Sequence, residues 1–414
     1  MERVTPNALL STINRQLPTT NRQPPTFFIF GQYMKYYIIA GEASGDLHGS
    51  NLIREIKRRD TVALIRGWGG GLMQEAGAEI VKDYRDLAFM GFTEVIRNLP
   101  TILKNIKFCK SDILQFKPDA VIFIDYPGFN LRIAEWARKM GFKTIYYISP
   151  QVWAWKESRV KGIRENIDKM LVILPFEQGF FRKWNYETEY VGHPLVEVIE
   201  QFKKSDEADS LPKIYIDGGE KVQPAKPLIA ILPGSRKQEI LMKLPVMLEA
   251  SRQFPDFQFV VAEAPGQDPD FYDEVLKNYP QAGRVRNQTY SLLMHARAAC
   301  VTSGTATLET ALFGVPEVIC YKGSSISYQI AKRLIKVKYI SLVNLIMDKP
   351  VVKELIQEEM NVKNIVAELR KLISDDETRS RIYRDYAELR ELLSQGGNAS
   401  EKAASLIVDF VKKS

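Results

Sequence analysis

Residues 301–316, VTSGTATLETALFGVP, indicate a strand, a tight turn and a helix in direct succession. The apolar run that ends at Val301 suits a buried strand of a parallel sheet. Ser303, Gly304 and Thr305 would form the turn. Gly304 lets a ligand approach the backbone closely, and Ser303 or Thr305 can cap the helix that follows. A strand that runs straight into a helix is the building unit of an α/β fold.

The same residues are typical of a site for a sugar nucleotide. The first N–H groups of the helix would point beyond the carboxyl end of the sheet, which suits a phosphate. Glu309 lies one turn further along the helix, on the same face as Thr305. A carboxylate repels phosphate but accepts hydrogen bonds from the two hydroxyls of a ribose. The alternative is an ordinary strand–turn–helix unit with a capped helix.

Composition limits the class of protein. With 414 residues and 45% hydrophobic content, the chain is long enough for two domains with large cores. No apolar run reaches the roughly 18 residues of a membrane span. The cysteines and histidines lack the spacing of a disulfide framework or a zinc site, so we expect a reducing compartment and no metal. The net charge of +7 favours phosphates or acidic lipid surfaces, without the dense basic patch of a nucleic-acid-binding protein.

Residues 1–33 differ from the rest of the chain. They are rich in Thr, Asn, Gln and Pro, lack periodicity, and contain one short apolar patch at Phe27–Phe30. A secretory signal would need a longer apolar core and a cleavage site. We therefore expect a disordered, dispensable extension, with Met34 as a candidate translation start.

The first half of the chain alternates strands with helices. We expect strands at 36–40, 63–67, 118–125, 144–148 and 170–174. The first strand runs into GEASGDLHG (41–49), which is not the GxGxxG fingerprint of a dinucleotide site. This turn collects carboxylates, a hydroxyl and an imidazole where a stability-only turn rarely does. The residues of this turn that we expect to bind a ligand are Glu42, Ser44, Gly45, Asp46 and His48.

Two further loops of this half carry candidate functional residues. Asp125 ends a buried strand, which is a good position for a general base in an α/β sheet. Its other role would be to cap the next helix, but Asn130 is better placed for that. After the strand at 144–148, Gln151, Trp153 and Trp155 could form a wall for an apolar or sugar-bearing ligand, or could pack in the core.

Residues 87–110 combine apolar and basic character. The stretch 87–96 is apolar at most positions and includes Met90 and Glu94. The helix expected at 99–116 carries Lys104, Lys107 and Lys110 in one stripe. Such a stripe is either a solvated face or a surface that docks on an anionic membrane. In the second case Met90, Phe92 and Ile96 would enter the lipid; the alternative is that Met90 and Phe92 fill the core of the first domain.

The second half repeats the alternation after a charged, Gly- and Pro-containing segment at 197–226, where we place the domain boundary. Strands are expected at 228–232, 257–262 and 283–286. In the turn after the first of these, Gly234 and Ser235 offer backbone donors, and the planar fork of Arg236 suits phosphate oxygens. Amphipathic helices fill 351–413. The pattern predicts two Rossmann-like domains whose strand ends face a central cleft.

Seven motifs carry a more specific resemblance. They are GEASGD (41–46), MGFTEV (90–95), IDYPGFN (124–130), PQVWAW (150–155), VGHP (191–194), LPGSR (232–236) and SGTATLE (303–309). In this order they resemble the motif series of the lipid-A-disaccharide synthases, inverting glycosyltransferases of the GT-B fold. The resemblance covers about residue 34 to the C-terminus. Neither the N-terminal extension nor the insert around 205–226 touches a motif.

The resemblance implies a domain plan and a reaction. Residues 34–196 would bind the acceptor, 197–226 would link the domains, 227–350 would bind the UDP-sugar, and 351–414 would form C-terminal helices. UDP-2,3-diacylglucosamine would donate its sugar to the 6-hydroxyl of 2,3-diacylglucosamine 1-phosphate with inversion, without a metal or other cofactor. The enzyme would act at the inner face of the cytoplasmic membrane. Members of the family can exchange C-terminal segments in dimers, and the resemblance leaves a homodimer possible.

The resemblance also assigns roles to residues. Asp125 matches the proposed general base. The donor would contact Gly234, Ser235, Arg236, Ser303, Gly304, Thr305, Glu309 and Asn344. The acceptor would contact Glu42, Ser44, Gly45, Asp46, His48, Met90, Glu94, Asn130, Gln151, Trp153 and His193.

Two other functions fit parts of the sequence. A UDP-sugar epimerase shares the two-domain design and would need no apolar surface. A catalytically idle membrane-binding protein could have kept the nucleotide pocket. Asp125, intact beside intact donor motifs, argues against the idle protein.

Overall fold

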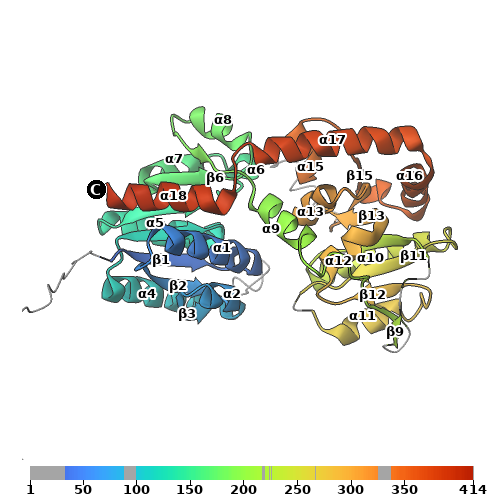
Figure 1. Ribbon diagram of the computed structural model, residues 1–414, viewed down its shortest axis with the longest axis horizontal. Helices are drawn as coiled ribbons and strands as arrows, with labels where there is room; N and C mark the ends of the chain where they lie inside the picture. The colour runs from blue at the N-terminus through green and yellow to red at the C-terminus, as the bar shows by residue number, and fades with distance from the viewer. Residues whose placement is uncertain are drawn as a thin grey trace, which may run out of the picture. The chain divides into compact units, whose positions relative to one another are not determined.

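The computed structural model describes residues 33–87, 99–216, 220–222, 224, 226–265, 267–324 and 337–413. The chain divides into two compact units, residues 1–33 and 34–414. The expected N-terminal extension lies outside the described residues except for Tyr33, and so do Met90 and Glu94. The second unit contains two β-sheets with helices packed on them (Figure 1).

The first sheet has seven strands, all paired in parallel, in the order β3-β2-β1-β4-β5-β6-β7. The strands are β1 (Lys35–Ala40), β2 (Leu64–Gly69), β3 (Glu79–Asp83), β4 (Ala120–Ile124), β5 (Lys143–Tyr147), β6 (Lys169–Val172) and β7 (Glu189–Tyr190). The order of strands reverses between β1 and β4. Open parallel sheets bind ligands at such a switch point, beyond the carboxyl ends of the strands. The turn after β1 and Asp125 after β4 therefore lie at the expected position for a site.

Helices cover both faces of this sheet. They are α1 (Ala43–Arg59), α2 (Gly71–Glu75), η1 (Tyr84–Leu87), α4 (Leu99–Phe116), α5 (Pro127–Lys139), α6 (Val152–Trp155), α7 (Arg159–Asn166) and α8 (Glu177–Arg182). Side chains of β1 alternate between two apolar cores: Tyr36 and Ile38 belong to one, and Tyr37 and Ile39 to the other. A strand buried on both faces reads as a continuous apolar run, which is why the sequence predicts β1 well.

The second sheet has eight strands in the order β15-β14-β13-β10-β11-β12-β8-β9. They are β8 (Ile214–Ile216), β9 (Glu220–Val222), β10 (Leu228–Leu232), β11 (Gln258–Ala262), β12 (Gly283–Val285), β13 (Ala296–Thr302), β14 (Glu317–Tyr321) and β15 (Lys353–Ile356). Here the order reverses between β10 and β13. The turn at Gly234 and the turn at Gly304 thus meet at the switch point of the second sheet.

The remaining helices pack mainly on the second sheet. They are α9 (Pro194–Lys203), α10 (Lys237–Ser251), α11 (Pro269–Leu276), α12 (Thr289–His295), α13 (Thr305–Phe313), α15 (Leu342–Met347), η3 (Gln357–Glu359), α16 (Val362–Ser374), α17 (Asp376–Ser394) and α18 (Ala399–Lys412). The last of these is an exception. Ala403 and Ile407 of α18 lie in a core of the first sheet, where α18 runs beside α1 (Figure 1).

The alternation of strands and helices is confirmed in both halves, and with it the α/β class. The segment 197–226, expected as a linker, contains most of α9 and the hairpin β8–β9. Strand β8 pairs antiparallel with β12, so this hairpin extends the second sheet. The helices after residue 351 divide between the two sheets. The expected division of residues 34–414 into domains stays a prediction.

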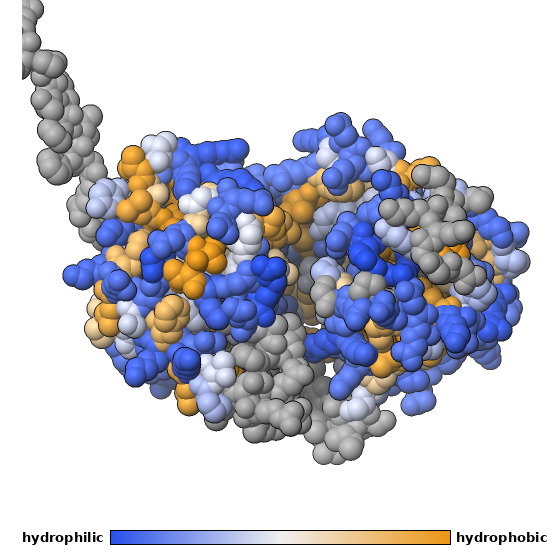
Figure 2. All heavy atoms as spheres, turned by 90° about the horizontal axis from the view of Figure 1, so that it is seen from below, coloured by the Kyte–Doolittle hydropathy of each residue, from blue (hydrophilic) through white to orange (hydrophobic). Residues whose placement is uncertain are grey.

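The face of the molecule in Figure 2 is mainly hydrophilic, with scattered apolar patches. Within α4, Leu103 and Phe108 expose 55% and 45% of their surface. Among the described residues, no helix is both long and apolar enough to cross a membrane.

The chain passes between the two sheets twice, and the two passages touch. Gly192 has φ +90°, and a Cβ atom on Gly396 would lie 2.0 Å from the Gly192 nitrogen. Nearby, the His193 N–H donates to the Leu393 carbonyl at 3.3 Å, and the Tyr190 hydroxyl donates to the same carbonyl at 3.2 Å. A side chain at either glycine would separate the two backbones.

We expect Gly396→Ala to lower the free energy of unfolding by roughly 1–3 kcal/mol, the usual cost of overpacking. Gly162→Ala is the matched control, because a Cβ there meets nothing within 4 Å and Gly162 lies inside α7. That change should be neutral or stabilising by up to about 1 kcal/mol. Urea unfolding measures both. Equal stability of the two variants would show that the crossing tolerates a side chain.

Candidate active site

Strained backbone marks the carboxyl ends of β4 and β5. Asp125, Tyr126 and Ile148 have φ values of +44°, +51° and +65°. This left-handed region is costly for a residue with a Cβ atom, most of all for a β-branched one such as Ile148. The Tyr146 hydroxyl and the Asn130 amide both donate to the Asp125 carbonyl, at 2.5 and 2.7 Å, and hold this conformation. Strain that the surroundings maintain is typical of functional sites.

Asn130 stabilises the end of β4 through hydrogen bonds of its side-chain amide. Its buried amide also donates to the carbonyls of Ile124 at 3.3 Å and Ile39 at 3.4 Å, so it ties β4 to β1. No side chain caps α5, which begins after Tyr126. The interpretation of Asn130 as the helix cap is therefore wrong. Its amide instead fixes the backbone at Asp125 by donating to the Asp125 carbonyl.

Asp125 and Glu42 influence each other electrostatically, and Glu42 is also influenced by Arg236. Burial, together with the negative charge of Glu42, raises the pKa of the Asp125 carboxyl to about 6, and the hydrogen bond from the Tyr126 N–H opposes the rise. Partial desolvation also raises the pKa of Glu42, and the positive charge of Arg236 opposes this. The candidate base is thus electrostatically coupled to a second carboxylate, and that carboxylate to the arginine of the turn after β10. A carboxylate with such a pKa is ionised at neutral pH but more basic than an ordinary aspartate.

The donor-binding turns expected from sequence lie side by side. Gly234 has φ +111°, and a Cβ there would lie 3.3 Å from Cγ2 of Thr302 at the end of β13. Gly304 has φ +147°, and nothing lies within 4 Å of the position of its Cβ. Helix α13 begins at Thr305 with Gly304 as its N-cap and no capping side chain. The Thr307 N–H donates to the Gly304 carbonyl at 3.2 Å, and no side chain caps the N–H groups that precede it, which suits an anion at this helix start.

Ser303 and Thr305 do not cap this helix, so that expectation is wrong. The Ser303 hydroxyl donates instead to the Ile340 carbonyl at 2.7 Å, which ties the turn to the segment before α15. One turn into α13, Glu309 accepts a hydrogen bond from the Tyr290 hydroxyl at 2.9 Å. Burial raises the pKa of Glu309, and the Tyr290 hydrogen bond opposes the rise. Tyr290 lies in α12, and no motif indicated it.

Asn344 uses its side chain within the protein. The buried amide donates to the Val352 carbonyl at 2.9 Å and to Glu354 at 3.0 Å, and its oxygen accepts from the Val352 N–H at 3.0 Å. Glu354 also accepts hydrogen bonds from the N–H groups of Ile340 and Ser341. Asn344 and Glu354 therefore fix the segment that contacts Ser303. The sequence missed Glu354 because its partners precede it by ten or more residues.

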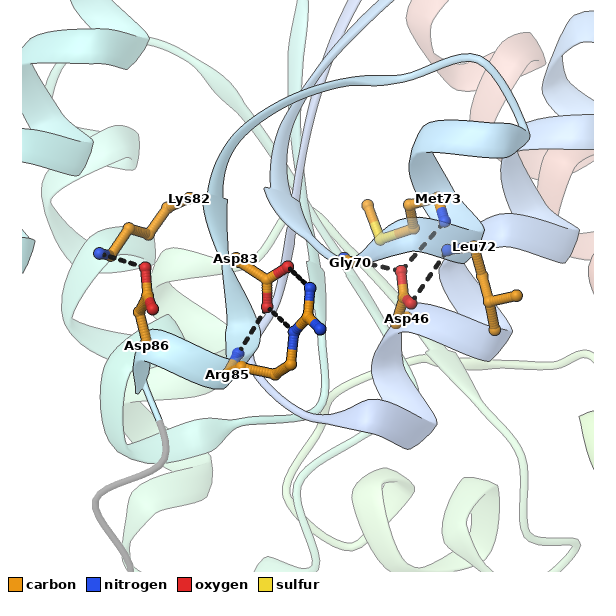
Figure 3. Close-up of polar contacts among 8 residues, drawn as sticks. All are labelled: Asp46, Gly70, Leu72, Met73, Lys82, Asp83, Arg85 and Asp86. Carbon is orange, nitrogen blue, oxygen red and sulfur yellow. Dashed lines mark hydrogen bonds and ion pairs between the residues drawn. The ribbon is translucent and has the colours of Figure 1, made fainter. Parts of the chain in front are cut away.

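Both carboxylate oxygens of Asp46 accept hydrogen bonds from backbone N–H groups. Its buried carboxylate accepts from the N–H groups of Gly70 at 2.8 Å, Leu72 at 3.2 Å and Met73 at 3.0 Å (Figure 3). These are the free N–H groups at the start of α2, so Asp46 is a helix cap. Among the other residues expected in this turn, Ser44 is exposed and Gly45 packs closely on Ala40.

Two histidines expected at the acceptor side are close enough to influence each other. Burial lowers the pKa of His48 to about 4, and burial together with His48 lowers that of His193 to about 3. Both are neutral at pH 7. His193 Nδ1 accepts from the Leu195 N–H at 3.2 Å and caps α9. His48 Nδ1 is buried without a hydrogen-bond partner in the part of the chain that the structure describes.

The residues expected to form a wall after β5 differ in their burial. Trp153 is buried, and its indole N–H donates to Glu177 at 3.1 Å, while Gln151 is exposed. Glu177 also accepts from the Ser149 hydroxyl and from the N–H groups of Ile173 and Leu174. Burial raises its pKa to about 7. Glu177, which no motif indicated, thus holds the loop after β5.

Comparison with solved structures shows the fold. The glycosyltransferase of kitacinnamycin matches with a TM-score of 0.62 and 14% identity, covering 91% of this chain and 99% of its own. A UDP-GlcNAc 2-epimerase from Neisseria meningitidis, solved with UDP-GlcNAc, matches with a TM-score of 0.62 and 13% identity, covering 92% and 100%. These proteins share the two-sheet GT-B architecture.

Comparison with sequences shows the family. The family model described as lipid-A-disaccharide synthetase matches residues 36–408. The lipid-A-disaccharide synthase of Syntrophus aciditrophicus is 40% identical over 383 residues, covering 91% of this chain and 98% of the relative. That of Geobacter sulfurreducens is 37% identical over 381 residues, covering 91% and 97%. The chain therefore belongs to the lipid-A-disaccharide synthase family and is a glycosyltransferase.

Proposed function

We propose that this enzyme transfers the sugar of UDP-2,3-diacylglucosamine to the 6-hydroxyl of 2,3-diacylglucosamine 1-phosphate. The products would be a β-1′,6-linked tetraacyl disaccharide 1-phosphate and UDP. Membership of the family supports the reaction. What supports the placement of the base is the packing of the turn after β1 against the end of β4: a Cβ on Gly41 would lie 2.3 Å from the Tyr126 ring, next to Asp125, and the charge of Arg236 reaches Glu42 in the same turn.

Asp125 acts as the general base in this proposal. Its carboxylate takes the proton of the acceptor hydroxyl while that oxygen attacks the anomeric carbon. The bond from this carbon to the oxygen of UDP breaks in the same displacement, which inverts the configuration without a covalent intermediate. The raised pKa suits the role, since a base works best when its pKa approaches the working pH.

The second sheet holds the donor. Arg236 and the first N–H groups of α13 bind the diphosphate and stabilise the charge on departing UDP. Glu309 accepts hydrogen bonds from the ribose. The side chain of Arg236 is 64% exposed and its contact with Glu239 is long, at 3.3 Å, so it can turn toward a ligand.

Incubation of the purified protein with UDP-2,3-diacylglucosamine, first alone and then with the lipid acceptor, tests the function. A transferase releases UDP only when the acceptor is present. An epimerase would alter the sugar of the donor alone, and a catalytically idle protein would do neither. Either of these last two results would overturn the proposal.

We also propose that the enzyme works at the inner face of the cytoplasmic membrane. Exposing acyl chains to water would cost about 0.8 kcal/mol per CH₂. On α4, the exposed side chains of Leu103 and Phe108 neighbour the exposed Lys104 and Lys107, which combines apolar and cationic groups on one helix. The expected lipid contacts Met90, Phe92 and Ile96 lie outside the described residues.

Asp125→Asn should reduce turnover by roughly 10²-fold or more while UDP still binds. In the unmodified enzyme, kcat/KM should fall below about pH 6, because protonated Asp125 cannot accept the proton. Glu42→Gln should move this acidic limb to lower pH, since it removes the negative charge that favours protonated Asp125. Rate profiles between pH 4 and 8 check both. Near-normal turnover by Asp125→Asn would remove Asp125 from the role.

Arg236→Ala should weaken UDP binding by about 1.5–3 kcal/mol, the range for a hydrogen bond to a charged group. Glu309→Ala should also weaken it, through the ribose. Arg252→Ala is the control, because Arg252 follows the other end of α10 and pairs with Glu249 at 3.1 Å. Calorimetry with UDP measures all three. Wild-type affinity in both Arg236→Ala and Glu309→Ala would place the nucleotide elsewhere.

Changing Lys104, Lys107 and Lys110 together to Glu should reduce binding to anionic vesicles and raise the apparent KM for the lipid acceptor. UDP affinity should stay the same. The control changes Lys402, Lys412 and Lys413 to Glu, which alters the net charge equally on α18 and just after it. Vesicle sedimentation at low salt, where the attraction is strongest, compares them. Equal binding by the two triple variants would contradict the proposed surface.

A further inference from the structure

A lysine is buried against the turn that follows β10. Lys243 of α10 has a side chain that is 2% exposed. In the described part of the chain, the hydrogen bond of its ammonium is a long one, to Glu239 at 3.5 Å. An ammonium has three donors, and a buried cation is costly unless it is paired. Such a costly arrangement calls for an explanation beyond packing.

Gly234 shows where this ion pair lies. A Cβ on Gly234 would be 3.5 Å from Nζ of Lys243, 3.2 Å from the Glu239 carboxylate and 3.3 Å from Thr302. The pair therefore lies directly against the donor turn, beside the end of β13. Thr302 leads into the Ser303–Thr305 turn, so both expected phosphate-binding turns are next to the pair.

Glu239 is shared between two cations. One oxygen contacts Arg236 at 3.3 Å, and the other contacts Lys243 at 3.5 Å. Burial lowers the pKa of Lys243, and Glu239 opposes this by favouring the charged ammonium. The three side chains together carry a net charge of one. Without the ammonium, Arg236 would be the cation left to pair with Glu239, and the net charge would be zero.

We propose that Lys243 is a positioning residue whose buried ammonium neutralises Glu239, which leaves the Arg236 guanidinium free to bind the donor's diphosphate. The inference rests on the proposed function, because it takes the diphosphate to be the ligand of Arg236. When UDP-sugar binds, Arg236 leaves Glu239 for the phosphate oxygens, and Lys243 keeps the carboxylate paired. Lys243 itself does not touch the ligand.

The test measures UDP binding by calorimetry in Lys243→Met, Glu239→Gln and the double variant. Methionine fills a similar volume, and replacing a buried charge by an apolar group is often tolerated. Lys243→Met should weaken UDP binding by about tenfold or more, since an unneutralised Glu239 both retains Arg236 and repels the phosphates. Glu239→Gln should bind UDP at least as tightly as the wild type. The double variant should return to within about threefold of the wild type, because no carboxylate then competes for Arg236.

Lys237→Met is the matched control. It removes the same charge from the first residue of the same helix, where the ammonium lies over the Phe271 ring at 5.0 Å. Its effect on UDP affinity should be well below that of Lys243→Met, and Glu239→Gln should not rescue it.

Several results would overturn the inference. Unchanged UDP affinity in folded Lys243→Met would make Lys243 a purely structural residue. A loss that the double variant does not rescue would mean that Lys243 contacts the ligand itself. An equal loss of UDP affinity in Lys237→Met would show that the effect comes from the net charge of the helix and not from the position of Lys243. If Lys243→Met does not fold, weaker binding by Glu239→Gln alone contradicts the inference. Failure of the wild type to bind UDP would instead overturn the proposed function.

Discussion

The position of the site depends on one constraint, the reversal of strand order in each parallel sheet. Where neighbouring strands lead away to opposite sides, their carboxyl ends leave room for a ligand. The first sheet reverses between β1 and β4, which sets Glu42 beside Asp125. The second reverses between β10 and β13, which joins the turns at Gly234 and Gly304. The attraction between Glu42 and Arg236 links these two edges.

Several polar residues expected at the site are hydrogen-bonded within the protein. Asp46 caps α2, Asn130 holds the strained end of β4, and Asn344 fixes the segment that contacts Ser303. Buried polar groups must be paired, so a loop with an unusual shape needs such internal partners. The motif series therefore combines residues suited to the chemistry with residues that shape the backbone around it.

The charged residues of the site also depend on supporting neighbours. Asp125 is more basic than an ordinary aspartate because it is desolvated beside another carboxylate. On the donor side, a carboxylate again controls a neighbour, since Glu239 lies between Arg236 and the buried Lys243. In both places the charge of a neighbouring group affects how the first can act. Sequence motifs name the first group of each set and omit Lys243.

The sequence by itself determined the α/β class, the strand ends that carry Asp125 and Arg236, and the family. Apolar runs, turn glycines and short motifs are local signals, and each is complete within a few residues. Tertiary structure decided that β8 extends the second sheet, that α18 packs beside α1, and that Lys243 is buried under a turn. The partners of these groups lie far away in the chain, and an amphipathic helix or a charged side chain does not specify which surface it will meet. The raised pKa of Asp125 was likewise decided by the tertiary structure, because it depends on neighbours that only folding brings together.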